Sequence, residues 1–164
     1  NMALINGRPM LDYAFEFALA SKKNTDIIVS TDDDAIAQYA KDNNIKVVRR
    51  PVSLGGDVPL IEVYRHALNE IGSEGVTAVV GLQPDHPDRN ISLDEAIEAF
   101  EEANADVLES DEADGTHNGA HYIMSIAFLE TEKADKIVTI IDDCTNVHHQ
   151  EDLDRAAENL IRRS

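Results

Sequence analysis

Short apolar runs alternate with segments of helical periodicity along this chain, and that alternation restricts the fold more than any other feature. We expect strands at residues 26–31, 45–48, 76–82, 105–109, 121–126 and 135–141. We expect helices at residues 9–20, 33–43, 58–71, 92–104 and 150–163, and a turn at residues 115–118. Strands that alternate with helices of this length need crossover connections, so the sequence predicts an α/β fold with a mainly parallel sheet.

Polar residues mark the starts of several predicted helices. Ser92 and Glu95 stand in the register of a capping box, and Pro9 occupies the first-turn place that proline favours. Asp33 is predicted to cap the second helix and Asp57 the third. Both carboxylates are therefore assigned to helix starts rather than to a ligand.

Length and charge limit the possible partners. The chain has 164 residues, enough for one domain with a sizeable core, and a formal net charge of −18. So acidic a surface repels phosphate backbones and anionic lipids, so we expect no nucleic acid and no membrane as partner. No apolar run approaches the roughly 20 residues of a membrane span. Cys144 is the single cysteine, which excludes an internal disulfide and makes the cytoplasm the expected location.

Polar and charged residues follow the predicted strands. In parallel sheets, ligands bind beyond the carboxyl ends of the strands, so these residues are the candidates for a binding site. They lie at residues 30–32, 49–51, 83–89 and 142–149. Amides, arginines and carboxylates at one edge predict a nucleotide site that also holds a metal.

The loop at residues 82–89, LQPDHPDR, belongs to a set of motifs. In chain order they are NMALINGRPMLDYAFEFAL, IIVSTDDDAIAQYAK, RRPVSLGGD, LQPDHPDR, NGAHYI and EDLDRAAENL. With these segments the chain resembles the cytidylyltransferases that activate acidic sugars, namely the CMP-sialic acid synthetase family and its relatives, the CMP-KDO synthetase-like nucleotidyltransferases. The likeness spans nearly the whole chain.

The resemblance implies a three-layer Rossmann-like nucleotidyltransferase fold, in a single domain over residues 1–164. It implies transfer of CMP from CTP to a sialic acid-like sugar, with release of pyrophosphate, in polysaccharide biosynthesis. Mg²⁺ or Mn²⁺ would be the cofactor, and a homodimer is the expected assembly. In the family, a first strand and a Gly-rich phosphate loop precede the position of Asn1. We expect those elements upstream of this segment.

The resemblance also assigns roles to individual residues. Nucleotide binding falls to the residues that match the cytidine and phosphate side of the family's site: Asn1, Arg50, Gln83 and Pro84. An amide such as Gln83 both donates and accepts hydrogen bonds, which suits a base or a ribose. Alternatively, Arg50 is a solvated arginine that follows an edge strand and binds no ligand.

Catalysis and sugar binding are assigned in the same way. The catalytic candidates are Arg89 and Asp32. Arg89 would pair with a phosphate or a carboxylate, or else brace its loop. The sugar-binding candidates are Asn118 and Gly119, although Asn-Gly is also a common turn signal.

The chain departs from the family pattern at the metal site. Asn146 and His148 stand where the family has two aspartates ahead of the last helix. Mg²⁺ prefers oxygen ligands, and histidine is a poor one for it. Asp142 and Asp143 lie a few residues upstream and are the possible substitutes. These departures motivate a second hypothesis, a catalytically impaired family member that binds a nucleotide or sugar or serves in assembly.

Overall fold

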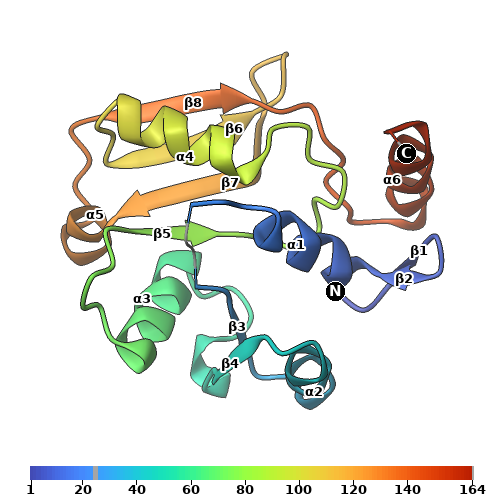
Figure 1. Ribbon diagram of the computed structural model, residues 1–164, viewed down its shortest axis with the longest axis horizontal. Helices are drawn as coiled ribbons and strands as arrows, with labels where there is room; N and C mark the ends of the chain where they lie inside the picture. Colours follow the sequence, from blue (N-terminus) through green and yellow to red (C-terminus); the bar gives the residue numbers. More distant parts are fainter. Residues whose placement is uncertain (24–25, 164) are drawn as a thin grey trace. The chain divides into compact units, whose positions relative to one another are not determined.

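A computed structural model describes residues 1–23 and 26–163 of the chain. The chain divides into two compact units, one of residues 1–25 with 80–164 and the other of residues 26–79. Helices and strands alternate through both units, so the predicted α/β class is confirmed (Figure 1).

The smaller unit is built on one strand–helix–strand crossover. Strands β3 (Ile28–Thr31) and β4 (Lys46–Arg49) pair in parallel, and helix α2 (Asp34–Asp42) connects them. Because parallel neighbours cannot be joined by a hairpin, the chain has to return through such a helix. The short 3₁₀ helix η1 (Val52–Leu54) and helix α3 (Leu60–Ile71) complete the unit.

Of the two helix caps predicted in this unit, one is confirmed and one is wrong. Asp33 caps α2, because its Oδ1 accepts a hydrogen bond from the Ile36 backbone N–H at 2.9 Å. The predicted cap of α3 at Asp57 is wrong. Pro59 is the residue before that helix, and no side chain caps it. Proline's fixed φ suits a helix start, so Pro59 sets the boundary two residues later than expected.

The larger unit contains a sheet of strand order β5-β7-β6-β8. The bounds are β5 (Ala78–Gly81, which spans the boundary between the units), β6 (Val107–Asp111), β7 (His117–Ser125) and β8 (Ile137–Ile141). Strand β6 runs parallel to β8 and antiparallel to β7. The sheet is therefore mixed, with β7 running against β6.

The reason is a tight turn between β6 and β7. The Glu112 N–H donates to the Thr116 carbonyl at 2.8 Å, and the Gly115 N–H donates back to the Glu112 carbonyl at 2.9 Å. Gly115 has a φ of +88°, which glycine adopts without strain. A connection this short forces the strands to be antiparallel. The turn predicted at residues 115–118 lies earlier, because β7 already begins at His117.

One helix was missed. Strand β7 ends at Ser125, and helix α5 (Ile126–Thr131) begins at Ile126, which was assigned to a strand. The Ser125 hydroxyl caps α5 by accepting a hydrogen bond from the Phe128 N–H at 3.1 Å. A continuous apolar run reads equally as strand or helix, so only this serine marked the change.

Helix α4 (Leu93–Glu102) lies against β6, β7 and β8 (Figure 1). The predicted capping box is confirmed, with reciprocal bonds between Ser92 and Glu95. The side chains buried on this helix share one face, at Leu93, Ala96, Ile97 and Phe100. Their spacing of three and four residues is what a helix needs to bury a single stripe.

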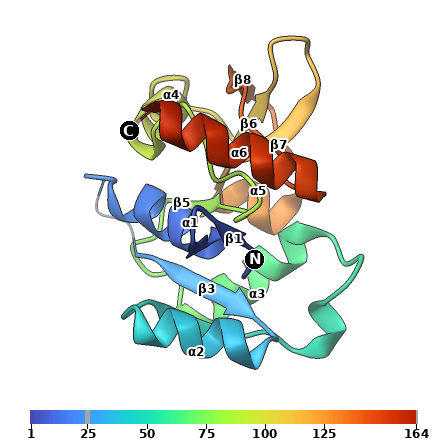
Figure 2. The same ribbon diagram turned by 90° about the vertical axis from the view of Figure 1, so that its right-hand side faces the viewer.

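The remaining elements are the strands β1 (Leu4–Ile5) and β2 (Arg8–Pro9) and the helices α1 (Met10–Leu19) and α6 (Gln150–Arg163). Helix α6 packs beside β1 (Figure 2). Its Ala156 forms a small buried cluster with Ile5 and Met10. The two ends of the sequence are thus held together within the larger unit.

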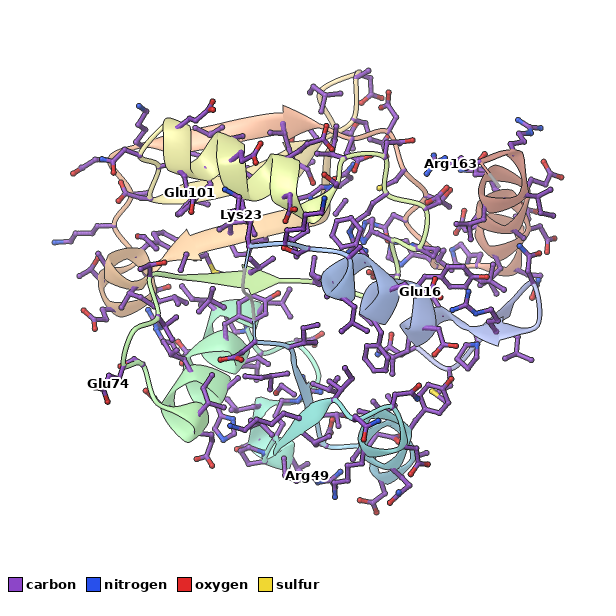
Figure 3. All side chains as sticks on the ribbon, in the orientation of Figure 1. Glu16, Lys23, Arg49, Glu74, Glu101 and Arg163 are labelled. Atoms are coloured by element: carbon purple, nitrogen blue, oxygen red, sulfur yellow. The ribbon has the colours of Figure 1, made fainter. Side chains whose placement is uncertain are left out.

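The acidic surface carries scattered ion pairs. Lys23 and Glu101 lie near each other (Figure 3), with 3.1 Å between Nζ and Oε2. Arg8 Nη2 lies 2.6 Å from Glu16 Oε1. Exposed pairs of this kind contribute little to stability. No helix in the described part of the chain is long and apolar enough to cross a membrane.

Candidate functional site

The loop that follows β5 is held rigidly by Arg89. Its three guanidinium nitrogens donate to backbone carbonyls: Nε to Ala120, Nη1 to His86 and Nη2 to Gln83, each at 2.7 Å. The guanidinium also lies 5.1 Å from the centroid of the Phe17 ring. Burial lowers the pKa of Arg89 from its ordinary value. These contacts fit the bracing alternative, and contact of Arg89 with a substrate stays a prediction.

Gln83 and Pro84 lie at the start of this loop and are half-buried. The Gln83 carbonyl is one of the three that Arg89 holds, at 2.7 Å. Proline cannot rotate about φ, so Pro84 and Pro87 restrict the loop further. The loop is thus a stiff platform beyond a strand end, and the nucleotide-binding role of Gln83 and Pro84 stays a prediction.

Asp85 and His86 form a pair within the same loop, which the sequence assigned to no role. His86 Nδ1 lies 2.9 Å from Asp85 Oδ1. The His86 side chain is 2% exposed and that of Asp85 is 25% exposed. Burial raises the pKa of Asp85, but the hydrogen bond and charge of His86 and the charge of Arg89 outweigh it and bring the pKa below its ordinary value. An acidic residue between two prolines after an apolar run was the available signal.

Asp142, a predicted substitute metal ligand, is buried at the end of β8 and is fully occupied by the protein. Its carboxylate accepts hydrogen bonds from the Asn90 N–H and Nδ2, from the Ile91 N–H, and faces His121 Nε2 at 2.7 Å. Burial raises its pKa, but the bonds from His121 and Asn90 outweigh burial and lower it. The arrangement suits a structural anchor between α4 and the sheet.

The predicted sugar-binding residues lie inside β7 and not in a turn. Asn118 is 6% exposed, and its Nδ2 donates to the Asp142 carbonyl at 2.7 Å. Its Oδ1 accepts from the Ser110 hydroxyl at 2.7 Å and from the Ala120 N–H at 3.0 Å. Gly119 has a φ of +70°, and the register of β6 and β7 shifts between Glu109 and Asp111. The turn alternative for Asn-Gly is therefore wrong, and a role in sugar binding stays a prediction.

The segment after β8 carries the other metal candidates. Asp143 is exposed, and its Oδ1 accepts from the Ala113 N–H at 2.7 Å. Asn146 has a buried Oδ1 that no hydrogen-bond donor of the described residues reaches. His148 is exposed, and its ring centroid lies 6.4 Å from that of His149. The backbone N–H groups of both histidines donate to Asp152 Oδ2, which fixes the start of α6.

This segment is tied to the loop after β5. The Val147 N–H donates to the Asp85 carbonyl at 2.9 Å. Thr145 donates to the buried Asp88 through its N–H and its hydroxyl, both at 2.8 Å. Asn146, with its unpartnered oxygen, therefore lies next to a residue whose backbone contacts Asp85.

Cys144 lies in the same segment and is 7% exposed. Burial raises the pKa of its thiol to about 12. A thiol in that state is protonated at neutral pH and unreactive. Cys144 therefore acts as a small buried side chain.

The fit of a divalent metal to these residues is limited. Over residues 1–23 and 26–163, no group of three or more His, Cys, Asp or Glu side chains is placed to hold a metal ion. Asp85 and Asn146 nevertheless supply a half-exposed carboxylate and an unsatisfied amide oxygen. Both are oxygen donors of the kind that Mg²⁺ accepts, and Mg²⁺ commonly takes its other ligands from substrate phosphates and water.

Within the smaller unit, Asp32 and Arg50 form an ion pair. Arg50 Nη2 lies 2.8 Å from Asp32 Oδ1, while Arg50 Nε is buried without a hydrogen-bond partner among the described residues. The hydrogen bond from Arg50 is the main cause that lowers the pKa of Asp32. Arg49, the neighbouring cation, lies 2.6 Å from Asp34. The structure thus brings together two predicted residues at the ends of β3 and β4.

Asn1 belongs to the larger unit and is exposed, and its carbonyl accepts a hydrogen bond from the Leu11 N–H at 3.0 Å. The predicted residues thus form groups within each unit. Gln83 joins Arg89, Asn118 joins Asp142, and Asp32 joins Arg50.

Comparison with known proteins identifies the family. The chain matches the cytidylyltransferase family over residues 1–160. It is 30% identical over 135 residues to the 8-amino-3,8-dideoxy-manno-octulosonate cytidylyltransferase of Shewanella sediminis, which covers 82% of this chain and 48% of that protein. The protein of the same name from Shewanella piezotolerans is 36% identical over 101 residues, covering 61% of this chain and 40% of the relative. The chain thus spans less than half the length of these curated relatives.

Solved structures agree on the fold. A CMP:2-keto-3-deoxy-manno-octonic acid synthetase complexed with CTP is similar with a TM-score of 0.77 at 11% identity, covering 99% of this chain and 92% of that one. A cytidylyltransferase from Leptospira borgpetersenii gives a TM-score of 0.67 at 19% identity, with 92% and 75% covered. The nucleotidyltransferase fold implied by the motifs is confirmed, and the chain belongs to the cytidylyltransferase family.

Proposed function

We propose that the protein transfers CMP from CTP to an acidic sugar of the 3-deoxy-octulosonate class. The observation that carries this proposal is the 30% identity, over 82% of this chain, to a relative named for an amino-dideoxy-octulosonate. This class replaces the sialic acid-like acceptor that the motifs led us to expect. Because the chain spans 48% of that relative, the proposal concerns the activity of the whole protein.

The proposed reaction is a nucleotidyl transfer. A hydroxyl oxygen of the sugar forms a bond to the α-phosphorus of CTP, and the hydroxyl gives up its proton. The bond between the α-phosphorus and the oxygen that bridges to the β-phosphate breaks, and pyrophosphate leaves with the electron pair. Such reactions depend mainly on the positioning of the reactants and on stabilisation of charge.

The residues near the strand ends supply the contacts in this proposal. Gln83 and Asn1 would bind the cytidine through amide groups, which donate and accept hydrogen bonds. Within the smaller unit, Asp32 holds the Arg50 guanidinium in one orientation at 2.8 Å, and the nucleotide-binding role of Arg50 stays a prediction. Arg89 would act through the loop it braces.

We further propose that Mg²⁺ accompanies the triphosphate. Asp85 and Asn146 are the protein oxygens best suited to hold it, because one is a half-exposed carboxylate and the other has no hydrogen-bond partner in the described residues. A bound Mg²⁺ would offset the negative charge of the phosphates.

The test is pyrophosphate release by the full-length protein. We expect release with CTP, Mg²⁺ and a 3-deoxy-octulosonate or its 8-amino analogue, and much less with ATP, GTP or UTP. Sialic acid in place of the octulosonate tests the acceptor class. Absence of release from every pair of nucleotide and acidic sugar, with Mg²⁺ or Mn²⁺, would overturn the proposal.

A second candidate is a family member that binds nucleotide or sugar without turnover. Asn146 and His148 favour it, because they replace two aspartates of the family pattern and no three-ligand metal cluster is present in the described residues. The double variant Asn146→Asp/His148→Asp separates the two candidates. Activity that appears only in this variant would support the impaired family member, and an already active parent protein would exclude it.

A further inference from the structure

His86 is a buried histidine in the loop after β5, and the proposed reaction gives it no role. It is 1% exposed, and its Nε2 has no hydrogen-bond partner among the described residues. Its Nδ1 lies 2.9 Å from Asp85 Oδ1. A carboxylate only accepts hydrogen bonds, so Nδ1 carries the proton. Among the described residues, Asp85 is therefore the hydrogen-bond partner of the ring.

The backbone around this pair is held from both sides. The His86 carbonyl accepts from Arg89 Nη1 at 2.7 Å, and the Asp85 carbonyl accepts from the Val147 N–H at 2.9 Å. Pro84 and Pro87 flank the pair and restrict φ on either side. The backbone of Asp85 is thus already held in place, and the hydrogen bond from His86 fixes its carboxylate.

The two oxygens of Asp85 have different environments. Oδ1 is occupied by His86, whereas no other residue in the described ranges, 1–23 and 26–163, donates a hydrogen bond to Oδ2. An aspartate rotates readily about its last side-chain bond, because that torsion has broad minima. A hydrogen bond to one oxygen stops this rotation and leaves the second oxygen pointing in a single direction.

We propose that His86 is a positioning residue that orients Asp85 so that its Oδ2 contacts the cation carried by the nucleotide. This inference rests on the proposed function and names a residue that supports the cation site. Groups that hold a ligating side chain in place typically change metal affinity by about 10- to 100-fold when they are removed. The role requires only the donor at Nδ1, and not a change of charge on the ring.

The test uses Mn²⁺ as the probe, because its paramagnetism reports binding directly. Mn²⁺ binding by the full-length protein is measured by electron paramagnetic resonance, alone and with CTP. His86→Asn keeps an N–H donor near the position of Nδ1, whereas His86→Gln places its amide near the position of Nε2. We expect His86→Gln to weaken Mn²⁺ binding about tenfold. His86→Asn is expected to stay close to the parent protein.

Two controls make the result specific. Asp85→Asn removes the proposed ligand, and His86→Gln in that background should have no further effect, because coupled residues are non-additive. Thermal unfolding of each variant checks the fold. A loss that occurs equally in His86→Asn and His86→Gln would indicate packing alone and overturn the inference.

The outcomes also separate this inference from the proposed function. If Asp85→Asn weakens Mn²⁺–CTP binding and His86→Gln does not, His86 has no positioning role while the proposed function stands. If Asp85→Asn has no effect, both Asp85 as ligand and His86 as its support are wrong, although CTP binding itself can persist. If the parent protein binds neither CTP nor Mn²⁺, the proposed function and this inference fail together.

Discussion

The strand ends of the two units use the same kinds of side chain in opposite ways. In the larger unit, Asp142 is buried and accepts hydrogen bonds from several groups. The Arg89 guanidinium donates hydrogen bonds to backbone carbonyls. In the smaller unit, Asp32 and Arg50 pair with each other, with side chains 37% and 22% exposed. Burial makes an unpaired polar group costly, so the first arrangement holds the fold together. The second is free to exchange its partner for a ligand.

Removal of the buried carboxylate should have the largest effect. Asp142→Ala leaves the buried His121 side chain without its hydrogen-bond partner and removes the acceptor of the Asn90 and Ile91 backbone N–H groups. We expect the free energy of unfolding to fall by about 3–5 kcal/mol, measured by urea denaturation. Asp143→Ala is the matched control, because that carboxylate is exposed and accepts from one backbone N–H, that of Ala113. Equal losses in the two variants would contradict the anchoring role.

Arg89→Lys comes next. Lysine keeps the positive charge but cannot reach the carbonyls of Gln83, His86 and Ala120 together, because it lacks the planar fork. We expect a loss of about 1–3 kcal/mol in the free energy of unfolding. Arg162→Lys, at an exposed pair with Glu158, should stay within about 0.5 kcal/mol of the parent protein. A loss as small as that of Arg162→Lys would show that the loop does not depend on the fork.

Cys144 reports on the exclusion of water from the buried region. Burial raises the pKa of its thiol to about 12, so the reactive thiolate is scarce in the folded protein at pH 8. We expect the thiol to react with iodoacetamide at least about tenfold more slowly in the native protein than in urea, where its pKa returns to about 8.5. The rate is followed by mass spectrometry. Equal rates would mean that water enters the segment freely.

Asp32→Asn should have the smallest effect on stability. The carboxylate lies in an exposed pair with Arg50, and such pairs are screened by solvent and salt. We expect no resolvable change in Tm at pH 7. A clear drop in Tm would place Asp32 among the structural carboxylates instead.

The pH dependence of that pair has a definite sign. The folded pKa of Asp32 is lowered, chiefly by the hydrogen bond from Arg50. Whatever stability the pair contributes is therefore present above the unfolded pKa, about 3.9, and is lost as the pH falls through the lower folded pKa. Any Tm difference between Asp32→Asn and the parent protein should therefore not grow as the pH is lowered from 7 to 3, and a difference that appears only in acid would contradict this sign.

Local sequence signals predicted much of the fold because they act over a few residues. The capping box of Ser92 and Glu95 and the cap at Asp33 needed no tertiary information. Helix α5 escaped notice because an apolar run has no period that separates strand from helix. The antiparallel course of β7 depended on a turn two residues earlier than expected, since a hairpin and a crossover differ only in connection length.

The sequence predicted the types of residue at the candidate site but not the role of each residue. The sequence placed amides, arginines and carboxylates after strands, and the structure has them there. It did not foresee that Asp142 and Asn118 would be occupied by the protein, because the Asp142 carboxylate bonds to residues 21–52 positions away along the chain and Asn118 bonds to the Asp142 carbonyl, 24 positions away. Nor did it single out Asp85 and His86, whose pairing depends on the loop conformation.

The sequence by itself determined the family, the α/β class and the starts of α2 and α4, since motifs and caps are local patterns. The tertiary structure alone decided which polar groups are buried and which are free. Burial depends on what distant segments cover, and it converts a carboxylate into either an anchor or a ligand. That difference separates Asp142, which is buried and bonded to Asn90, Ile91 and His121, from Asp85, whose side chain is 25% exposed.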